Sequence, residues 1–88
     1  MLTIVWESQF KKDFSLATKR GKNLEKLALI IENLQTKTPL PPKNKNHKLK
    51  GNYINCWECH IEPDWLLIYK TTNKELILIR TGSHSDLF

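Results

Sequence analysis

The chain has 88 residues and a formal net charge of +5, from 14 Lys and Arg against 9 Asp and Glu. Its 40% hydrophobic and 26% charged residues are typical of a globular protein, which argues against wholesale disorder and predicts one domain over residues 1–88. The longest apolar run, residues 65–69, is far shorter than the roughly 20 residues that span a bilayer, and no signal peptide is visible. We therefore expect a cytoplasmic protein with no membrane contact.

The N-terminal segment predicts a strand followed by a helix. Residues 2–6 form a short segment that is rich in β-branched side chains, which is typical of a strand. Phe10, Phe14 and Ala17 then recur at intervals of four and three. This spacing predicts an amphipathic helix that ends near Gly21.

A second helix is predicted directly after the first. Asn23 can cap its N-terminus, and its apolar stripe comprises Leu24, Leu27, Ile30, Ile31 and Leu34. The proline-rich segment 38–42 cannot continue a helix, so it ends the element. The two helices are expected to form a helical hairpin.

After the prolines, the hydrophobic period changes from that of a helix to that of a strand. Residues 44–50 form a basic loop or an edge strand, and a turn is expected at Gly51-Asn52. In residues 57–62 apolar side chains alternate with Glu58, His60 and Glu62, which predicts a strand with one solvent-facing side.

The C-terminal segment predicts two more strands. Pro63-Asp64 forms a turn, strands follow over 65–71 and 75–80, and residues 83–88 are expected to be a short tail. The order β-α-α-β-β-β indicates an α+β fold, a helical hairpin packed on an antiparallel β-sheet.

The two cysteines match the C-x-x-C-H pattern that attaches c-type haem, with Cys56, Cys59 and His60. In a strand, two residues three positions apart face opposite sides of the sheet, so the thiols cannot jointly hold one metal ion without a bend. Haem attachment also normally accompanies export and a second axial ligand, often Met, yet Met1 is the only methionine. We expect neither haem nor a metal site.

The positive charge is unevenly placed along the chain. Residues 1–50 hold 11 bases and 4 acids, whereas residues 51–88 hold 3 bases and 5 acids. A small basic domain with such a field is typical of proteins that bind nucleic acid or an acidic protein. A merely soluble, lysine-rich surface is the alternative at this point.

Three histidines, two carboxylates and one arginine are candidates for chemistry on RNA. Glu58 and His60 share a strand face, Asp64 follows at the turn, and Arg80 precedes His84 by four residues. His47 lies in the basic loop. Cleavage of RNA without a metal needs a base for the 2′-OH, an acid for the leaving 5′ oxygen, and a cation for the phosphate. Histidine and arginine suit these roles.

Two aromatic residues, Trp65 and Phe88, could stack on splayed RNA bases. Both also have a purely structural interpretation. Trp65 opens an apolar strand and could belong to the core, and Phe88 could simply fix the chain end.

Three segments together resemble one protein family. The run from His60 to Tyr69 (HIEPDWLLIY), the run from Arg80 to His84 (RTGSH) and the closing Leu87-Phe88 are similar to the YafQ type of toxin. This type belongs to the RelE/ParE superfamily of bacterial toxin–antitoxin systems. The basic segment 47–51 also resembles the matching loop, so the resemblance covers essentially the whole chain.

The resemblance implies a ribosome-dependent endoribonuclease (mRNA interferase) that cuts mRNA and inhibits translation, with no metal or organic cofactor. It implies 2′-OH attack and a 2′,3′-cyclic phosphate product. His84 would be the general acid, and His47 and His60 would serve as base and in the transition state. The remaining implied site residues are Asp64, Arg80 and Glu58 in the catalytic set and Trp65, Phe88, Lys48 and Lys50 in RNA binding.

The family also implies partners other than the ribosome and mRNA. A cognate antitoxin of the DinJ type, acidic or partly disordered, would block the site, and operator DNA would be contacted only through it. Two alternatives remain open: a ParE-like toxin that binds gyrase, and an RNA-binding module without catalysis. ParE-like chains generally lack the three histidines, which favours the nuclease.

Overall fold

A computed structural model describes all residues 1–88 as three α-helices and a five-stranded sheet. The elements are β1 (Thr3–Trp6), α1 (Ser8–Lys19), α2 (Leu24–Gln35), β2 (His47–Lys48), β3 (Trp57–Glu62), β4 (Trp65–Thr71), β5 (Glu75–Gly82) and α3 (His84–Leu87). Two short 3₁₀ turns, η1 (Pro42–Asn44) and η2 (Gly51–Tyr53), flank β2. No helix is long and apolar enough to cross a bilayer.

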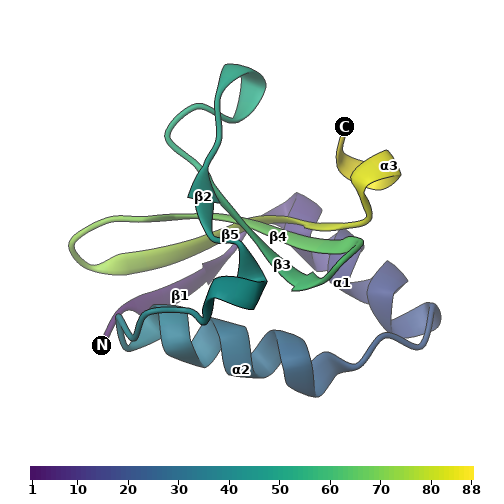
Figure 1. Cartoon of the computed structure of the whole chain (residues 1–88), viewed down its shortest axis with the longest axis horizontal. Coiled ribbons are helices and arrows are strands. Elements are labelled where there is room, and N and C mark those ends of the chain that lie inside the picture. The colour runs from purple at the N-terminus through teal and green to yellow at the C-terminus, as the bar shows by residue number, and fades with distance from the viewer.

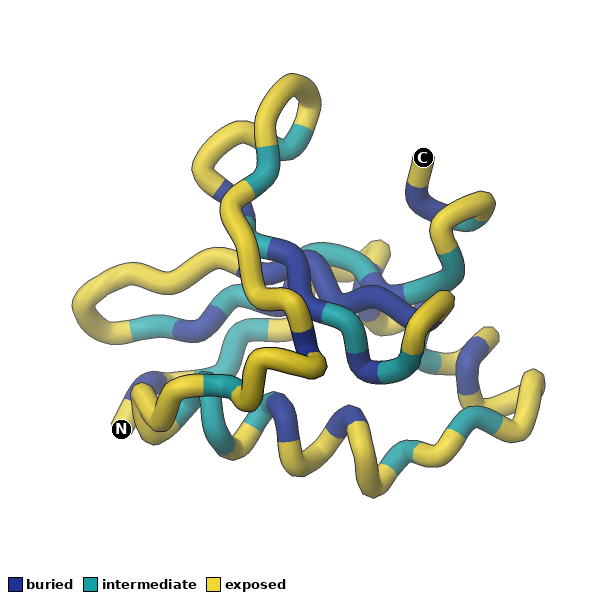
Figure 2. The backbone as a smooth tube through the Cα atoms, in the orientation of Figure 1, coloured by how far each residue is buried: buried dark blue, intermediate teal, exposed yellow.

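The sheet has helices α1 and α2 packed on one face and two smaller features on the other (Figure 1). These features are α3 and the segment 49–56, which we call the finger. Both rise from the face opposite α2, which we call the site face. The finger and β2 are mostly exposed, whereas β4 is buried over its first five residues (Figure 2).

The two long helices form as the sequence predicts. The side chain of Asn23 accepts a hydrogen bond from the Glu25 backbone N–H at 3.1 Å, which caps α2. Between the helices Gly21 has a φ of +73°, a conformation that glycine adopts without steric strain. This residue therefore ends α1 and lets the chain turn into α2.

The strand order is β1-β5-β4-β3-β2. The predicted α+β class with a helical hairpin on a mainly antiparallel sheet is confirmed, with one refinement: β1 pairs parallel to β5, from Thr3 opposite Glu75 to Trp6 opposite Leu78. Two parallel strands need a long connection between them, and here α1, α2 and the strands β2 to β4 connect β1 to β5. The pattern of residues 2–6 does not encode this direction.

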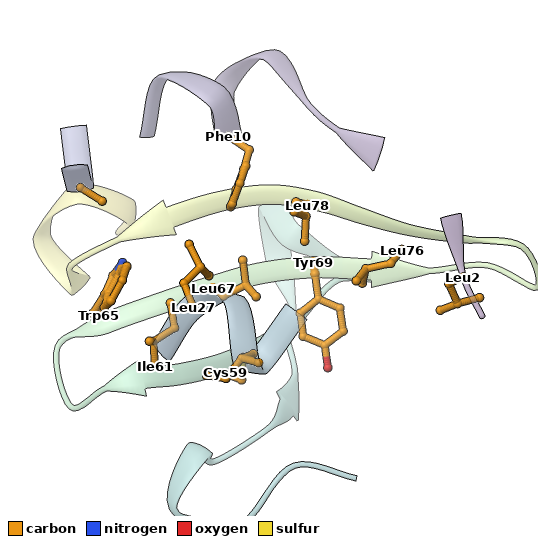
Figure 3. Packing of buried hydrophobic residues seen from close by; sticks show 12 residues of the cluster. Leu2, Phe10, Leu27, Cys59, Ile61, Trp65, Leu67, Tyr69, Leu76 and Leu78 are labelled. Atoms are coloured by element: carbon orange, nitrogen blue, oxygen red, sulfur yellow. The ribbon is translucent and has the colours of Figure 1, made fainter. Parts of the chain in front are cut away.

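The main core lies between the helices and the sheet (Figure 3). Strand β4 contributes Trp65, Leu67 and Tyr69 to this core, while Leu66 and Ile68 form a smaller cluster on the site face. Because β4 is central and covered on both sides, its sequence is a continuous apolar run rather than an alternating one. The site face thus has a rigid, apolar floor.

The cysteines lie in different clusters, as their spacing predicts. Cys59 packs in the main core and Cys56 in the site-face cluster, and both are free thiols. Burial raises the pKa of Cys59 to about 12, so this thiol is inert.

The C-terminus differs from the predicted tail, because residues 84–87 form the helix α3. The Ser83 hydroxyl accepts a hydrogen bond from the Asp86 N–H, and the Asp86 carboxylate accepts one from the Ser83 N–H. This reciprocal capping box starts the helix. The sequence signal was present as Ser followed three residues later by an acid.

Candidate functional site

Two rows of paired residues run across the site face. Glu58 of β3 lies opposite Ile68 of β4, which lies opposite Arg80 of β5. Residues directly opposite one another in a sheet point to the same face. Neighbouring strands lie about 4.8 Å apart, so Glu58 and Arg80 are separated by roughly two strand spacings.

The second row continues the same face toward α3. His60 lies opposite Leu66, and Leu66 lies opposite Gly82, from which the chain enters α3 at His84. The ring centroids of His60 and His84 are 5.7 Å apart, although 24 positions separate them in the chain. The sheet register therefore places two of the predicted histidines side by side.

The third histidine joins them from the edge strand. His47 of β2 pairs with Glu58, and its ring centroid is 6.4 Å from that of His60. The ring of His60 thus neighbours those of His47 and His84 on the site face, and we call these three residues the histidine row.

Glu58 lies between the first two histidines and differs from its predicted exposure. Its Oε1 is 3.4 Å from Nε2 of His47 and 3.6 Å from Nε2 of His60. The residue is only 5% exposed, so the strand face predicted to be solvent-facing is covered here. A buried carboxylate needs donors or cations nearby, and the two imidazoles are the groups within reach.

The backbone sets which ring nitrogens of these two histidines face Glu58. Nδ1 of His47 is 2.7 Å from the carbonyl oxygen of Lys45, and Nδ1 of His60 is 3.3 Å from that of Pro63. A carbonyl oxygen can only accept, so both Nδ1 atoms carry the proton. Nε2 is then the ring nitrogen that faces Glu58 and that can exchange a proton with this carboxylate or with a substrate.

Asp64 holds His84 in the same manner. Its Oδ1 accepts hydrogen bonds from the His84 backbone N–H at 2.8 Å and from Nδ1 at 2.6 Å. These bonds keep the pKa of Asp64 below its usual range. Nδ1 therefore carries a proton, and Nε2 points away from Asp64, on a side chain that is about half exposed.

Arg80 is anchored from beneath by α1. The carboxylate of Asp13 accepts from Nε of Arg80 at 2.7 Å and from a terminal nitrogen at 3.1 Å. The same carboxylate accepts the Thr81 N–H at 3.1 Å. β1 pairs with β5 only as far as Leu78, so Asp13 takes the backbone donor that a longer β1 would have bonded. The Asp13 hydrogen bonds raise the pKa of Arg80 above its usual range, which keeps the guanidinium charged.

Exposed groups surround the histidine row and Arg80. Phe88 is 65% exposed and lies edge-to-face with Tyr53 of η2, with ring centroids 5.8 Å apart. Lys48 of β2 and Lys50 of the finger are also exposed. The site face therefore combines proton carriers, a fixed guanidinium, an accessible aromatic ring and exposed cations, a set that suits a phosphodiester substrate.

Comparisons with known proteins give the family. Residues 2–88 match the model of a family described as the bacterial toxin of a type II toxin–antitoxin system, YafQ. The chain is 44% identical over 86 residues to the mRNA interferase toxin YafQ of Escherichia coli K12, covering 97% of this chain and 94% of that one.

The chain belongs to the YafQ family of toxins.

Solved structures of bacterial toxins share the fold over the full length. The Escherichia coli DinJ–YafQ toxin–antitoxin complex contains a chain with a TM-score of 0.92 and 43% identity, covering 99% of this chain and 97% of that one. A metal-bound toxin from Helicobacter pylori has a TM-score of 0.93 and 46% identity, with both chains fully covered.

In this YafQ family member, Trp65 is not placed as an RNA-binding residue. It is 1% exposed and packs in the main core on the helix side of the sheet (Figure 3), so the structure contradicts its predicted stacking on RNA. The reason is the period of β4: Trp65, Leu67 and Tyr69 all face the helices. Trp65 thus occupies the core position that its structural interpretation predicts.

Glu62 does not share the face of Glu58 and His60, contrary to the alternation. The pairing of β3 with β4 shifts register between His60 and Glu62. The Glu62 carboxylate instead lies 3.0 Å from Nζ of Lys26 on α2. A β-bulge reverses the direction of the side chains that follow it, and the sequence gives no clear sign of one here.

Two residues near the site were missed by the sequence analysis. Asp13 sits among the apolar positions of α1, and a charged residue beside such a stripe was the available signal. Tyr53 follows the Gly51-Asn52 turn and carries no pattern of its own. No three His, Cys, Asp or Glu side chains converge closely enough to hold a metal ion.

Proposed function

We propose that this YafQ family member is a ribosome-dependent mRNA interferase that cleaves RNA by metal-independent attack of a 2′-OH on the adjacent phosphorus. The observation that carries the proposal is the histidine row together with Arg80 on one face of the sheet. The name of the 44% identical Escherichia coli relative supports the same class of activity.

The general base comes from the buried end of the row. Nε2 of His60 or His47 removes the proton of the 2′-OH, and Glu58, within 3.6 Å of both, stabilises the imidazolium that forms. The freed oxygen attacks the adjacent phosphorus and forms a 2′,3′-cyclic phosphate. The nucleophile belongs to the substrate, so the protein supplies orientation and proton transfer.

The general acid comes from the exposed end. His84 in its imidazolium form donates the Nε2 proton to the departing 5′ oxygen and leaves a 5′-OH product. Asp64 orients the ring for this transfer because it accepts the hydrogen bond from Nδ1. One proton is taken and one is given, so the net charge of the row does not change. Proton exchange with solvent then restores the starting form of each histidine.

Arg80 stabilises the charge that grows on the phosphoryl oxygens. Asp13 occupies Nε and one N–H of a terminal nitrogen, so other guanidinium donors stay available for the phosphate. Phe88, Lys48 and Lys50 bind the flanking RNA by stacking and by charge. Engagement of ribosomal RNA suits a protein with a net charge of +5.

We also assign this chain a DinJ-like antitoxin as its partner. The support is the fold shared with the toxin chain of the DinJ–YafQ complexes. An acidic segment that lies across the site face would meet Arg80 and the basic finger. Binding measured by calorimetry at several salt concentrations would then weaken as salt rises.

The test is cleavage of a defined mRNA in EDTA, with and without programmed ribosomes. Wild type is compared with His84→Ala and with Ser85→Ala, a control that changes the neighbouring exposed residue of α3. We expect ribosome-stimulated cuts with 2′,3′-cyclic phosphate and 5′-OH ends, lost in His84→Ala by about 10²-fold or more and kept in Ser85→Ala.

Other outcomes have definite meanings. Cleavage that stops in EDTA would contradict the metal-independent mechanism. Cleavage at the full rate without ribosomes would contradict the proposed ribosome dependence but not the proposed cleavage mechanism. No cleavage under any condition would contradict the nuclease, and a gyrase supercoiling assay would then test the ParE-like alternative.

A further inference from the structure

The short helix α3, which carries His84, is held in place from outside. It has only four residues, too few to be stable alone. One side is fixed by Asp64, through the backbone N–H and Nδ1 of His84. A second attachment comes from the other side, from the end of α1.

Arg20, the C-cap residue that follows α1, forms this second attachment. One terminal nitrogen of Arg20 is 2.6 Å from Oδ2 of Asp86 and the other is 3.3 Å from Oδ1, so the pair is bidentate. The two residues are 66 positions apart, and Asp86 is the acidic member of the capping box that starts α3. The hydrogen bonds from Arg20, with that from Ser83, hold the pKa of Asp86 well below its usual range.

The fit between β5 and α3 depends on this arrangement. A Cβ added at Gly82 would lie 2.9 Å from Cβ of Asp86, closer than real Cβ atoms approach. Gly82 therefore lets α3 fold back tightly onto the end of β5. In that position Asp86 reaches Arg20, and His84 reaches Asp64 and the ring of His60.

We propose that Arg20 is a positioning residue for His84, acting through Asp86 and the capping box of α3. This inference rests on the proposed function for its effect on RNA cleavage, but its structural part stands without it. An exposed ion pair is usually worth little to global stability. A bidentate pair that fixes a four-residue helix acts locally. It raises the fraction of molecules in which α3 is folded and His84 lies beside His60.

The test compares Arg20→Gln with Lys74→Gln, which removes one positive charge from the exposed turn between β4 and β5. Both variants lose one positive charge. Any general weakening of the attraction to RNA is therefore the same in both. We expect Arg20→Gln to lower the cleavage kcat roughly 3- to 10-fold with little change in KM, and Lys74→Gln to leave kcat unchanged. Arg20→Lys, which keeps the charge but not the fork, should fall between them.

Nuclear magnetic resonance gives a readout that does not need the nuclease activity. In Arg20→Gln the amides of residues 84–88 should lose order on the nanosecond timescale, and the His84 ring resonances should move toward those of a solvent-exposed histidine. The amides of the central strand β4 should stay unchanged, which shows that the variant is folded. If cleavage is absent in the wild type, the proposed function fails, but this comparison still decides the role of Arg20.

A mutant cycle with Asp86→Asn completes the design. If Arg20 acts through Asp86, the double variant should lose no more order in α3 than Asp86→Asn alone. Two results would overturn the inference: an ordered α3 with unshifted His84 resonances in Arg20→Gln, or effects of the two substitutions that simply add.

Discussion

The carboxylate of Asp64 binds His84 twice, at the backbone N–H and at Nδ1, with both bonds made by the same oxygen, Oδ1. Asp64 belongs to the turn between β3 and β4, and His84 is the first residue of α3, 20 positions later. The contact fixes both the place of the imidazole and its protonated nitrogen. The proposed general acid therefore depends on a turn residue that is distant in sequence.

Replacement of Asp64 by Asn tests this contact. The amide can still accept from the backbone N–H, but it has no negative charge to stabilise the imidazolium. We expect ribosome-dependent cleavage to fall at least about tenfold. An unchanged cleavage rate in Asp64→Asn would remove Asp64 from the catalytic set.

Acid should release the same contact. The pKa of Asp64 lies below its ordinary 3.8 in the folded chain, so folding favours the ionised form. The resulting stabilisation is fully present above pH 3.8 and is lost as the pH falls through the lower folded value. In an NMR titration we expect the His84 amide to shift with the Asp64 carboxyl carbon, at a pH below that of a model aspartate. A midpoint at or above 3.8 would contradict the hydrogen bonds.

Asp13 should matter more for stability than its place on α1 suggests. It is buried and accepts from Arg80 twice, from Thr81 and from Gln9. Asp13→Ala leaves the Thr81 N–H and a half-buried guanidinium without this partner, so we expect a loss of about 2–4 kcal/mol in the free energy of unfolding.

The control for Asp13 is the exposed Glu32→Ala on α2, which should change stability by less than about 0.5 kcal/mol. Urea denaturation measures both variants. A loss in Asp13→Ala no larger than that of the control would show that the buried cluster contributes little.

Trp65 and Phe88 should behave oppositely, although both are aromatic residues implied in RNA binding by the family resemblance. Trp65→Ala empties the main core and should destabilise the chain by about 3–5 kcal/mol. Phe88→Ala should leave stability within about 0.5 kcal/mol but weaken RNA binding by about 1–3 kcal/mol.

Trp65→Phe separates packing from recognition at this position, because it keeps a ring in the core and removes the indole N–H. That N–H is buried without a hydrogen-bond partner. The variant should therefore retain RNA binding, measured by fluorescence anisotropy with labelled RNA. A folded Trp65→Phe variant that lost RNA binding would restore Trp65 to the RNA interface.

The lysines next to the histidine row should act through charge alone. If Lys48 and Lys50 contact RNA phosphates as proposed, Lys48→Ala and Lys50→Ala should each lower the slope of log affinity against log salt by about 0.7 for single-stranded RNA. Lys74→Ala, at the far turn, should leave the slope unchanged. Equal slopes for all three variants and wild type would exclude a local RNA path along the finger.

Local patterns predicted most of the elements. The spacing of Phe10, Phe14 and Ala17 gave α1, Asn23 gave the start of α2, and residues 65–71 gave β4 with its observed bounds. Elements of this kind depend on side-chain periodicity and on caps, which act within a few residues. The expected tail is instead a helix, because the Ser83–Asp86 capping box starts α3, and the signal for this box is equally local.

The sequence by itself determined the residue types of the site: three histidines, their carboxylates, and an arginine in the RTGSH run, together with the family they indicate. Only the tertiary structure decided how they combine. Strand register aligned Glu58 with Arg80 and His60 with Gly82, and a bulge turned Glu62 toward Lys26. Burial removed Trp65 from the surface. Register, bulges and burial depend on packing between segments far apart in the chain, and one-dimensional periodicity does not record such packing.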